Sequence, residues 1–196
     1  AGNRFLTPQA MDVLIEGGNL EVKFNLLTNP VLAGRHLEKL LDDPSPLVRA
    51  KLARRKQLDN AIIQQLSDDG ELLVRGTNIL VGGRSDELLL GWADSDDIAN
   101  QQFLLLRQKL PQKVLESLCF SKHETVQLRA LKLRDLKPDE VLGWAHSESV
   151  AVRLYIASLP NLLPEVRLLL ARDNEEAVRK TLAANLSLQD SEAAVL

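Results

Sequence analysis

The chain has 196 residues, of which 45% are hydrophobic, 26% are charged and only 4% are aromatic, and its formal net charge is −3. This composition predicts a globular protein with a sizeable core and argues against wholesale disorder. The net charge is too small to attract a nucleic acid by itself, so only a local basic patch would bind one. No apolar run is long enough to span a bilayer, and we expect no membrane partner.

The most informative feature is a pattern that returns every 26 residues. A valine followed by a basic or polar residue marks this period, and Asn100-Gln101 takes the one remaining position. The pairs are Val22-Lys23, Val48-Arg49, Val74-Arg75, Val126-Gln127, Val152-Arg153 and Val178-Arg179. A strict period of this size predicts a solenoid of stacked repeats. The composition, rich in leucine and poor in aromatic residues, favours helices over strands.

In chain order, residues 1–14 are expected to supply only the second helix of a repeat, and six complete repeats and a truncated seventh follow. The first helix of each complete repeat is expected to follow an Asp or Ser, because these residues cap free N–H groups. The predicted starts lie near Pro44, Gly70, Asp96, Lys122, Glu148 and Asn174. We expect one solenoid domain over residues 1–196.

A second, shorter helix is expected after a turn in each repeat. Its core column is predicted to be Leu32, Leu58, Leu110, Leu136, Leu162 and Leu188, with Arg84 as the exception, and its first turn carries Pro8, Pro111, Pro138 and Pro164. Trp92 and Trp144 stand in the column that ends this helix, and we interpret them as core fillers rather than stacking platforms. Cys119 stands in a column of small residues, so its thiol is expected to be buried and unreactive.

The resemblance to known repeats rests on residues 43–58, which read DPSPLVRAKLARRKQL. This run resembles the leucine-rich repeat variant family, whose repeats read Asp-Pro-x-x-x-Val-Arg-x-x-Leu-Ala, and the wider group of short HEAT-like repeats. The resemblance implies an all-α, right-handed solenoid of about seven two-helix repeats, and it implies no activity. One member of that family carries a cysteine-ligated iron–sulfur module. Because this chain has a single cysteine, we carry over no cofactor.

Two sets of basic residues require an explanation. The residues that follow the valines, Lys23, Arg49, Arg75, Arg153 and Arg179, are interpreted as internal, each donating to a capping Asp or a helix-end carbonyl of an adjacent repeat. The alternative is a ladder that binds a polyanion. The second set lies in the turns between the two helices of a repeat and forms a basic ridge of candidate partner-binding residues: Arg54, Arg55, Lys56, Arg84, Arg107, Lys109, Lys132 and Arg134.

The distribution of this basic ridge favours a binding patch over a general helix-end effect. Helix dipoles attract bases to helix C-termini, but they predict bases in every repeat. These residues are confined to the second to fifth repeats, although a solvated edge remains the alternative. The third and fourth repeats also depart from the pattern at Gly76, Asn78, Gly82, Gly83 and Asn100. Either the solenoid bends there, or these groups face something, or one repeat has drifted.

No catalytic set emerges from the sequence. His36, His123 and His146 lack metal-ligand spacing to one another, so we expect no metal site and no enzymatic activity. We expect a scaffold that binds a protein, with DNA or another nucleic acid held along the basic ridge as the alternative. A HEAT-like DNA glycosylase comes third. The apolar end Ala193–Leu196 would cap a solenoid poorly, which suggests a longer chain or end-to-end association. The absence of disulfides favours the cytoplasm.

Overall fold

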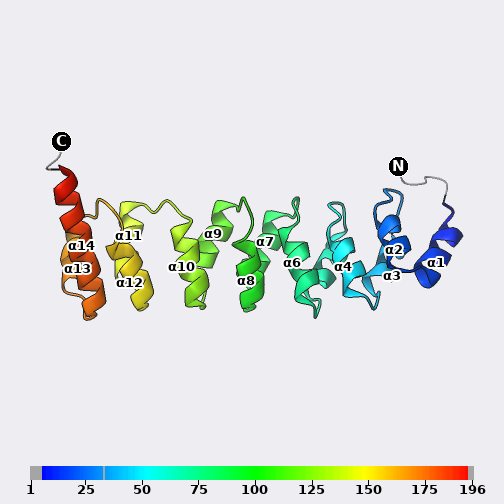
Figure 1. The fold of residues 1–196 in the computed structure, drawn as a ribbon, viewed down its shortest axis with the longest axis horizontal. Coiled ribbons are helices and arrows are strands. Elements are labelled where there is room, and N and C mark those ends of the chain that lie inside the picture. Colours follow the sequence, from blue (N-terminus) through cyan, green and yellow to red (C-terminus); the bar gives the residue numbers. More distant parts are fainter. Residues whose placement is uncertain (1–5, 33, 194–196) are drawn as a thin grey trace. The chain divides into compact units, whose positions relative to one another are not determined.

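The computed structural model describes residues 6–32 and 34–193, with side chains described as far as Asn185. Within these residues it contains 14 helices and no strand, so the predicted all-α class is confirmed (Figure 1). The chain divides into two compact units, Ala1–Val114 and Leu115–Leu196. Each unit is described by itself below, and the single solenoid domain stays a prediction.

Two series of helices alternate along the chain. The first helices begin 26 residues apart: α2 (Leu20–Leu27), α4 (Pro46–Ala53), α6 (Leu72–Leu80), α8 (Ile98–Leu104), α10 (Glu124–Lys132), α12 (Val150–Ala157) and α14 (Glu176–Ala193). The second helices lie between them: α1 (Pro8–Gly17), α3 (Arg35–Leu41), α5 (Asn60–Ser67), α7 (Asp86–Ala93), α9 (Gln112–Cys119), α11 (Pro138–Ala145) and α13 (Pro164–Ala171). From α2 to α13, the second helix of a repeat differs in length from the first by at most one residue, so it is not the distinctly shorter helix that was expected.

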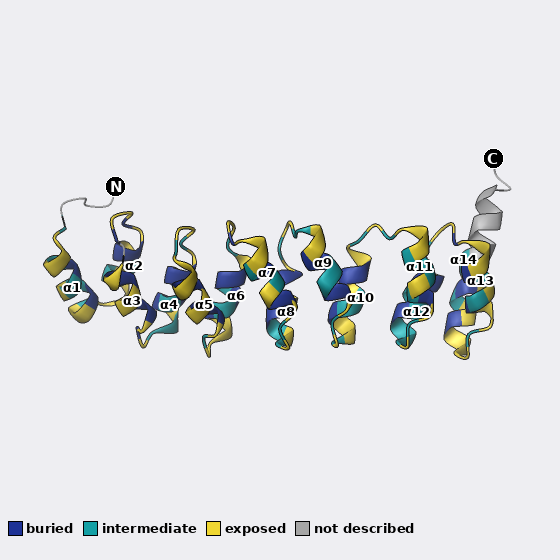
Figure 2. Ribbon diagram, turned by 180° about the vertical axis from the view of Figure 1, so that it is seen from behind, coloured by how far each residue is buried: buried dark blue, intermediate teal, exposed yellow. Residues whose placement is uncertain are grey.

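Neighbouring helices pack in sequence order within each unit. In unit 1, α4 packs against α2 and α6, α6 packs against α8, and α3 packs against α1 and α5. In unit 2, α12 packs against α10 and α14, and α11 packs against α13. Helices of this length are marginal in isolation, so their stability comes from packing. Buried segments, dark blue in Figure 2, alternate with exposed ones along the helices of unit 1. The fully buried side chains of Leu40, Leu52 and Leu66 are part of its core, and burying a leucine contributes about 1.5–3 kcal/mol.

The first helices begin two residues later than predicted, for example at Pro46 rather than near Pro44. The Asp43 carboxylate accepts a hydrogen bond from the backbone N–H of Ser45 at 2.9 Å, two residues further along the chain. Asp69 and Asp173 accept the same bond from Glu71 and Glu175, also at 2.9 Å. These side chains therefore fold the loop before the helix, as Asx turns do, and do not cap the helix itself.

The predicted leucine column lies in the turns before the second helices and not inside them. Leu32 and Leu162 are buried there, and Leu58, Leu110 and Leu136 are half-buried. At the end of the chain, α14 continues to Ala193, where a turn and a second helix were expected. The side chain of Leu188 lies outside the described residues, as do the side chains of residues 193–196, from which end-to-end association was predicted.

Trp92 is buried, as expected of a core filler. Trp144 is half-buried, and its ring lies 5.2 Å from that of the exposed Phe120. Cys119 is completely buried, and this burial raises the pKa of its thiol. Because the thiolate is the reactive form, both observations agree with the predicted inertness of this cysteine.

The irregular residues of the third repeat face one another inside unit 1. A Cβ atom at Gly76 would lie 2.6 Å from the ring of Phe103, so the glycine makes room for that ring. The buried Asn78 donates through Nδ2 to the carbonyl of Ile63 and to Oγ of Ser67, both at 3.0 Å. Its Oδ1 accepts from Nη2 of Arg84 at 2.9 Å. The sequence left three explanations for these residues: a bend, polar groups that face a partner, or drift of one repeat. The second explanation fits Asn78, and its partner is Arg84 of the same chain.

Asn100 differs from Asn78 and provides a matched test. Asn100 is 7% exposed, and its Oδ1 has no hydrogen-bond partner among the described residues. Replacing it with the valine of the other repeats should raise the free energy of unfolding by about 1–3 kcal/mol, because a buried unpaired acceptor is removed. Asn78→Val should lower it by a similar amount, since Arg84 and Ser67 lose a buried partner. Urea denaturation measures both; destabilisation by Asn100→Val would contradict the assignment.

Candidate functional site

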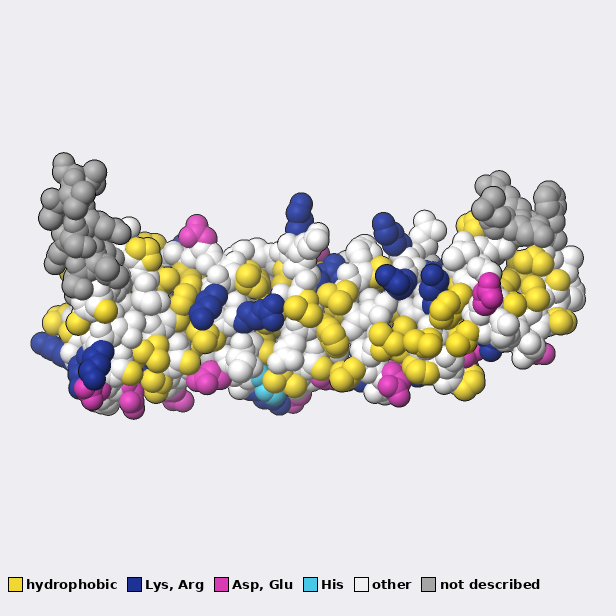
Figure 3. All heavy atoms as spheres, in the orientation of Figure 1, with side chains coloured by type: hydrophobic (Ala, Val, Ile, Leu, Met, Phe, Trp, Pro, Cys, Tyr) yellow, Lys and Arg dark blue, Asp and Glu magenta, His cyan; other side chains and the backbone are white. Residues whose placement is uncertain are grey.

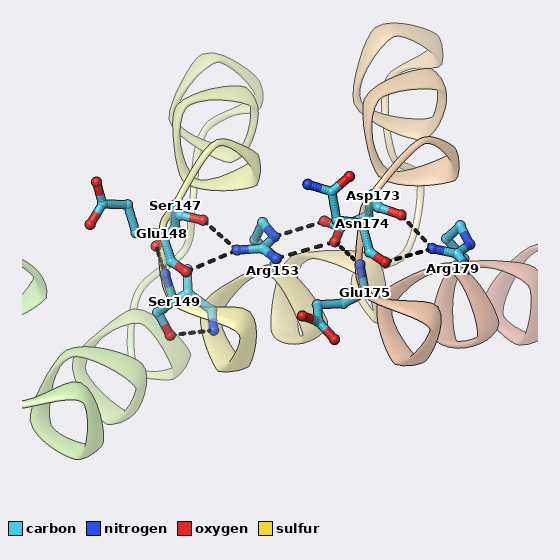
Figure 4. A network of polar contacts seen from close by, with 9 residues as sticks. Ser147, Glu148, Ser149, Arg153, Asp173, Asn174, Glu175 and Arg179 are labelled. Atoms are coloured by element: carbon cyan, nitrogen blue, oxygen red, sulfur yellow. Dashed lines mark hydrogen bonds and ion pairs between the residues drawn. The ribbon is translucent and has the colours of Figure 1, made fainter.

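The arginines that follow the repeated valines connect successive loops. In unit 2, Arg153 donates from Nε and Nη2 to the two carboxylate oxygens of Asp173 at 2.7 and 3.2 Å (Figure 4). Its Nη1 donates to the carbonyls of Ser147 and Glu148 at 2.8 and 3.0 Å. One guanidinium thus binds the loop before its own helix and the corresponding loop of the next repeat, with the bidentate geometry that makes charge-assisted bonds strong.

Unit 1 repeats this arrangement. Arg49 donates to both carboxylate oxygens of Asp69 at 2.6 and 3.0 Å, and Lys23 donates to Asp43 at 2.6 Å. The hydrogen bonds from Arg49 and Arg153 lower the pKa of Asp69 and of Asp173. The internal interpretation is therefore confirmed for Lys23, Arg49 and Arg153, whose charges are paired within the chain. Arg179 is exposed and donates to the carbonyls of Asp173 and Asn174, in the loop before its own helix.

Gln101 takes the arginine position in the fourth repeat and keeps part of its role. Its Nε2 donates to the carbonyls of Ala93 and Ser95 at 2.8 and 2.9 Å. A neutral amide therefore satisfies helix-end and loop carbonyls that would otherwise be buried without a donor.

Several residues of the predicted basic ridge also point into the protein. Arg55 donates to the carbonyls of Leu27 and Asn29 at 2.6 and 3.1 Å, and to the carbonyl of Leu32 at 3.1 Å. Leu27 is the last residue of α2, so this guanidinium closes the C-terminal end of the first helix of the preceding repeat. Arg107 makes the equivalent bonds to the carbonyls of Ile79 and Val81, at the end of α6.

Arg84 is only 6% exposed, and this burial corrects its assignment to a partner-binding surface. Its Nη2 donates to the carbonyl of Ala53 at 2.9 Å and its Nη1 to that of Arg55 at 3.4 Å. In the repeat of Arg84, the position of Arg55 and Arg107 is held by Val81, whose side chain has no hydrogen-bond donor. Arg84 therefore donates to the carbonyls at the end of α4 in place of that residue. Desolvation by burial lowers the pKa of Arg84 to about 10, and it remains a cation at neutral pH.

The other ridge residues divide between paired and exposed side chains. Arg134, in unit 2, has a side chain that is 6% exposed and donates to Glu140 at 2.6 Å. Lys132 is exposed, with its ammonium 5.8 Å from the centre of the Tyr155 ring. Arg54, Lys56 and Lys109 of unit 1 are exposed. The prediction that the seven ridge residues other than Arg84 lie along one edge spans both units and stays a prediction.

Sequence reasoning missed an apolar surface on the first helices of unit 1. We name it the first-helix face; it consists of Phe24, Leu47, Lys51, Arg54, Leu73, Leu80, Phe103 and Leu106. Its four leucines are 43–54% exposed, and the ammonium of Lys51 lies 5.8 Å from the centre of the Phe24 ring. The signal that would have found it is a helical spacing, Leu47, Lys51 and Arg54 in α4, repeated in the neighbouring helices.

Acidic residues are nearly absent from this face. At the positions of α2, α6 and α8 that correspond to Leu47, Ala50, Lys51 and Arg54 of α4, the sole acidic residue is Glu21. In the half of Figure 3 that draws unit 1, most of the acidic side chains in view lie low on the drawing, near the loops that precede the first helices. The first-helix face therefore offers apolar side chains and cations with little competition from carboxylates.

Unit 2 contains a separate cavity of about 310 Å³ between the turns that precede α11 and α13. Tyr155, Leu136, Leu159 and Leu162 belong to its lining, together with Pro138 and Pro160. Arg134 and Asp135 supply charged groups in its wall. Its volume is at the lower end of the range found for small-molecule sites.

The described residues contain no group of three or more His, Cys, Asp or Glu side chains placed to hold a metal ion. Over the same residues, no helix combines the length and the apolarity needed to cross a membrane. No family model, curated protein or solved structure matches this chain.

The neighbours Arg54 and Arg55 test the division between exposed and internal arginines. Arg55→Ala should lower the free energy of unfolding by about 1.5–3 kcal/mol, because three backbone carbonyls lose a charged donor. Arg54→Ala, at an exposed side chain, should change it by no more than about 0.5 kcal/mol. Urea denaturation of the two variants measures the difference; equal effects would mean that the bonds of Arg55 do not stabilise the fold.

Proposed function

We propose that this chain is a non-catalytic helical-repeat scaffold that binds another protein through the first-helix face of unit 1. The proposal includes a right-handed solenoid of about seven repeats, of the leucine-rich repeat variant or short HEAT-like type. The observation that carries it is the first-helix face itself, on which exposed leucines of α4 and α6, and the one just after α8, stand among cations. We also place the protein in the cytoplasm, where a lone thiol persists.

The apolar part of the face supports a protein partner. A single exposed leucine is ordinary, because much of any protein surface is apolar. Leu73 and Leu80 of α6 are joined by Leu47 of α4 and by Leu106, which lies two residues after the end of α8, and α6 packs against both of those helices. Contiguous apolar patches of this kind mark interaction surfaces, and interface cores are depleted of charge.

The cations of the face favour a partner segment that carries acidic as well as apolar side chains. Lys51 and Arg54 flank the leucines, and Glu21 is the only acidic residue at the corresponding positions. Charge complementarity of this kind speeds association and rejects wrong partners more than it adds affinity. The apolar contacts are therefore expected to supply most of the binding free energy.

Nucleic-acid binding is supported less well. Phosphate recognition needs free cations in a row, because each contact releases counterions. Within unit 1, Arg55, Arg84 and Arg107 are bonded to backbone carbonyls, and Leu80 and Leu106 occupy the position that Arg54 has in α4. The exposed cations of the ridge in this unit reduce to Arg54, Lys56 and Lys109.

Leu73 and Leu72 are neighbours of equal exposure and give the test. Leu73 lies in the first-helix face at 51% exposure, whereas Leu72 is the first residue of α6, outside the face, at 52%. Leu73→Asp should weaken partner binding at least tenfold, on the order of 1.4 kcal/mol or more, and Leu72→Asp should leave it unchanged. The partner is captured from native lysate with and without nuclease, and its affinity is then measured at increasing salt.

Two outcomes would contradict the proposal. Loss of capture after nuclease treatment, together with an affinity that falls steeply with salt, would assign the surface to nucleic acid. Equal weakening by Leu72→Asp and Leu73→Asp would show that the first-helix face is not the binding surface. Both variants must retain the wild-type denaturation midpoint for the comparison to hold.

A further inference from the structure

The end of a first helix recurs as a binding site for a side chain of the next repeat. Arg55 donates to the carbonyls of Leu27 and Asn29, and Arg107 donates to those of Ile79 and Val81. Arg84 likewise donates to the backbone carbonyls of Ala53 and Arg55. Asn185 donates to those of Ala157 and Leu159. The accepting carbonyls occupy the same two positions of the repeat each time, so this is one site used four times.

One helix end in unit 2 lacks this donor. The corresponding carbonyls are those of Leu131 and Leu133, at the end of α10, and the positions of Arg55 and Arg84 are held by Leu159 and Leu162. Leucine has no donor, and among the described residues no side chain donates to either carbonyl, although the carbonyl of Leu131 accepts from the backbone N–H of Arg134 at 3.2 Å. The carbonyl of Leu136, which corresponds to the one of Leu32 that Arg55 bonds, likewise receives no side-chain donor among the described residues.

A cavity of about 310 Å³ lies beside the carbonyl-bearing residue Leu136, and neither Leu131 nor Leu133 is part of its lining. Its lining includes Leu136, Leu159 and Leu162, the three residues whose positions take part in the arginine sites of unit 1. Leu159 is shorter than the arginine that stands at its position in other repeats. The space that a guanidinium fills elsewhere is therefore open here.

The chemistry of the cavity suits a guanidinium on an apolar stem. Asp135 is exposed in its wall and supplies a negative charge, and the Tyr155 ring supplies an aromatic surface. Leu162 and the prolines at 138 and 160 provide apolar walls of the kind that cover arginine methylenes. The positive charge of Arg134 is offset by Glu140 at 2.6 Å.

We propose that this cavity binds an arginine side chain of a partner protein, which donates to the carbonyl of Leu136, as Arg55 does to that of Leu32 within the chain, and pairs with Asp135. A guanidinium fits a carbonyl and a neighbouring carboxylate better than an ammonium does, because its donors form a planar fork. Burial of the cation has a precedent in this fold, since Arg84 is buried at an equivalent helix end. This inference rests on unit 2 alone and stands or falls separately from the first-helix face of unit 1.

The ligand class is tested with small probes of defined chemistry. N-acetyl-arginine N-methylamide, the matching lysine and leucine compounds, and free arginine are titrated into the full chain, and the amide NMR signals of Tyr155, Leu159 and Asn161 are followed. The capped arginine should bind with a dissociation constant on the order of millimolar, at least tenfold more tightly than capped lysine or capped leucine. Tighter binding of capped leucine, tenfold tighter binding of free arginine, or no binding at all would overturn the proposal.

Variants of the chain test the place of binding. Leu159→Arg restores the internal arginine and should abolish binding of the capped arginine, and Leu168→Arg on α13, at a 55% exposed leucine, should not. Asp135→Asn should weaken binding severalfold. If Leu159→Arg does not fold, Leu159→Asn replaces it in the test. This variant introduces the residue that stands at the same position in the next repeat, Asn185, and its side chain is smaller than arginine; it too should weaken binding of the capped arginine. Wild-type affinity in both folded Leu159 variants would overturn the assignment.

Discussion

The structure depends on hydrogen bonds from arginine side chains to the loops and helix ends of the neighbouring repeat. The helices of each pair are short, and each leaves N–H groups at its start and carbonyls at its end without internal partners. Arg49 and Arg153 bond the loops before the first helices, while Arg55, Arg84 and Arg107 bond the carbonyls after them. Buried leucines supply most of the stabilisation, but these bonds connect one helix pair to the next at both ends.

This use of arginine decides which surfaces are left for a partner. Cations that bond the chain internally cannot also bind phosphates, so the first-helix face, with its exposed leucines beside Lys51 and Arg54, is the more informative surface. The same reasoning makes Leu159 conspicuous, since a leucine there leaves a helix end without its usual donor. The bonding pattern, which occurs at four helix ends, thus directs attention to the position of Leu159 in unit 2, where an external group would take the place of the internal donor.

The 26-residue period was enough to predict the helical class, the pairing of helices and the internal role of Arg49 and Arg153. It did not predict the role of Arg55 or Arg84, because that depends on carbonyls more than 20 residues earlier in the chain, at the end of another helix. Arg84 did carry a signal, since it replaces a leucine of the core column. The start of α4 was misplaced by two residues because Asp43 folds an Asx turn, which looks like a helix cap in sequence.

The most direct test of the arginine bonds is a double-mutant cycle on Arg153 and Asp173, with Glu148→Gln, an exposed carboxylate in the same view, as control. At about pH 7 the coupling free energy should be about 1–3 kcal/mol. Arg153 lowers the pKa of Asp173, so this stabilisation is present above the unfolded pKa of about 3.9 and is lost as the pH falls through the folded value. Coupling should therefore be smaller at about pH 3. A coupling near zero at both pH values would contradict the central role of these bonds.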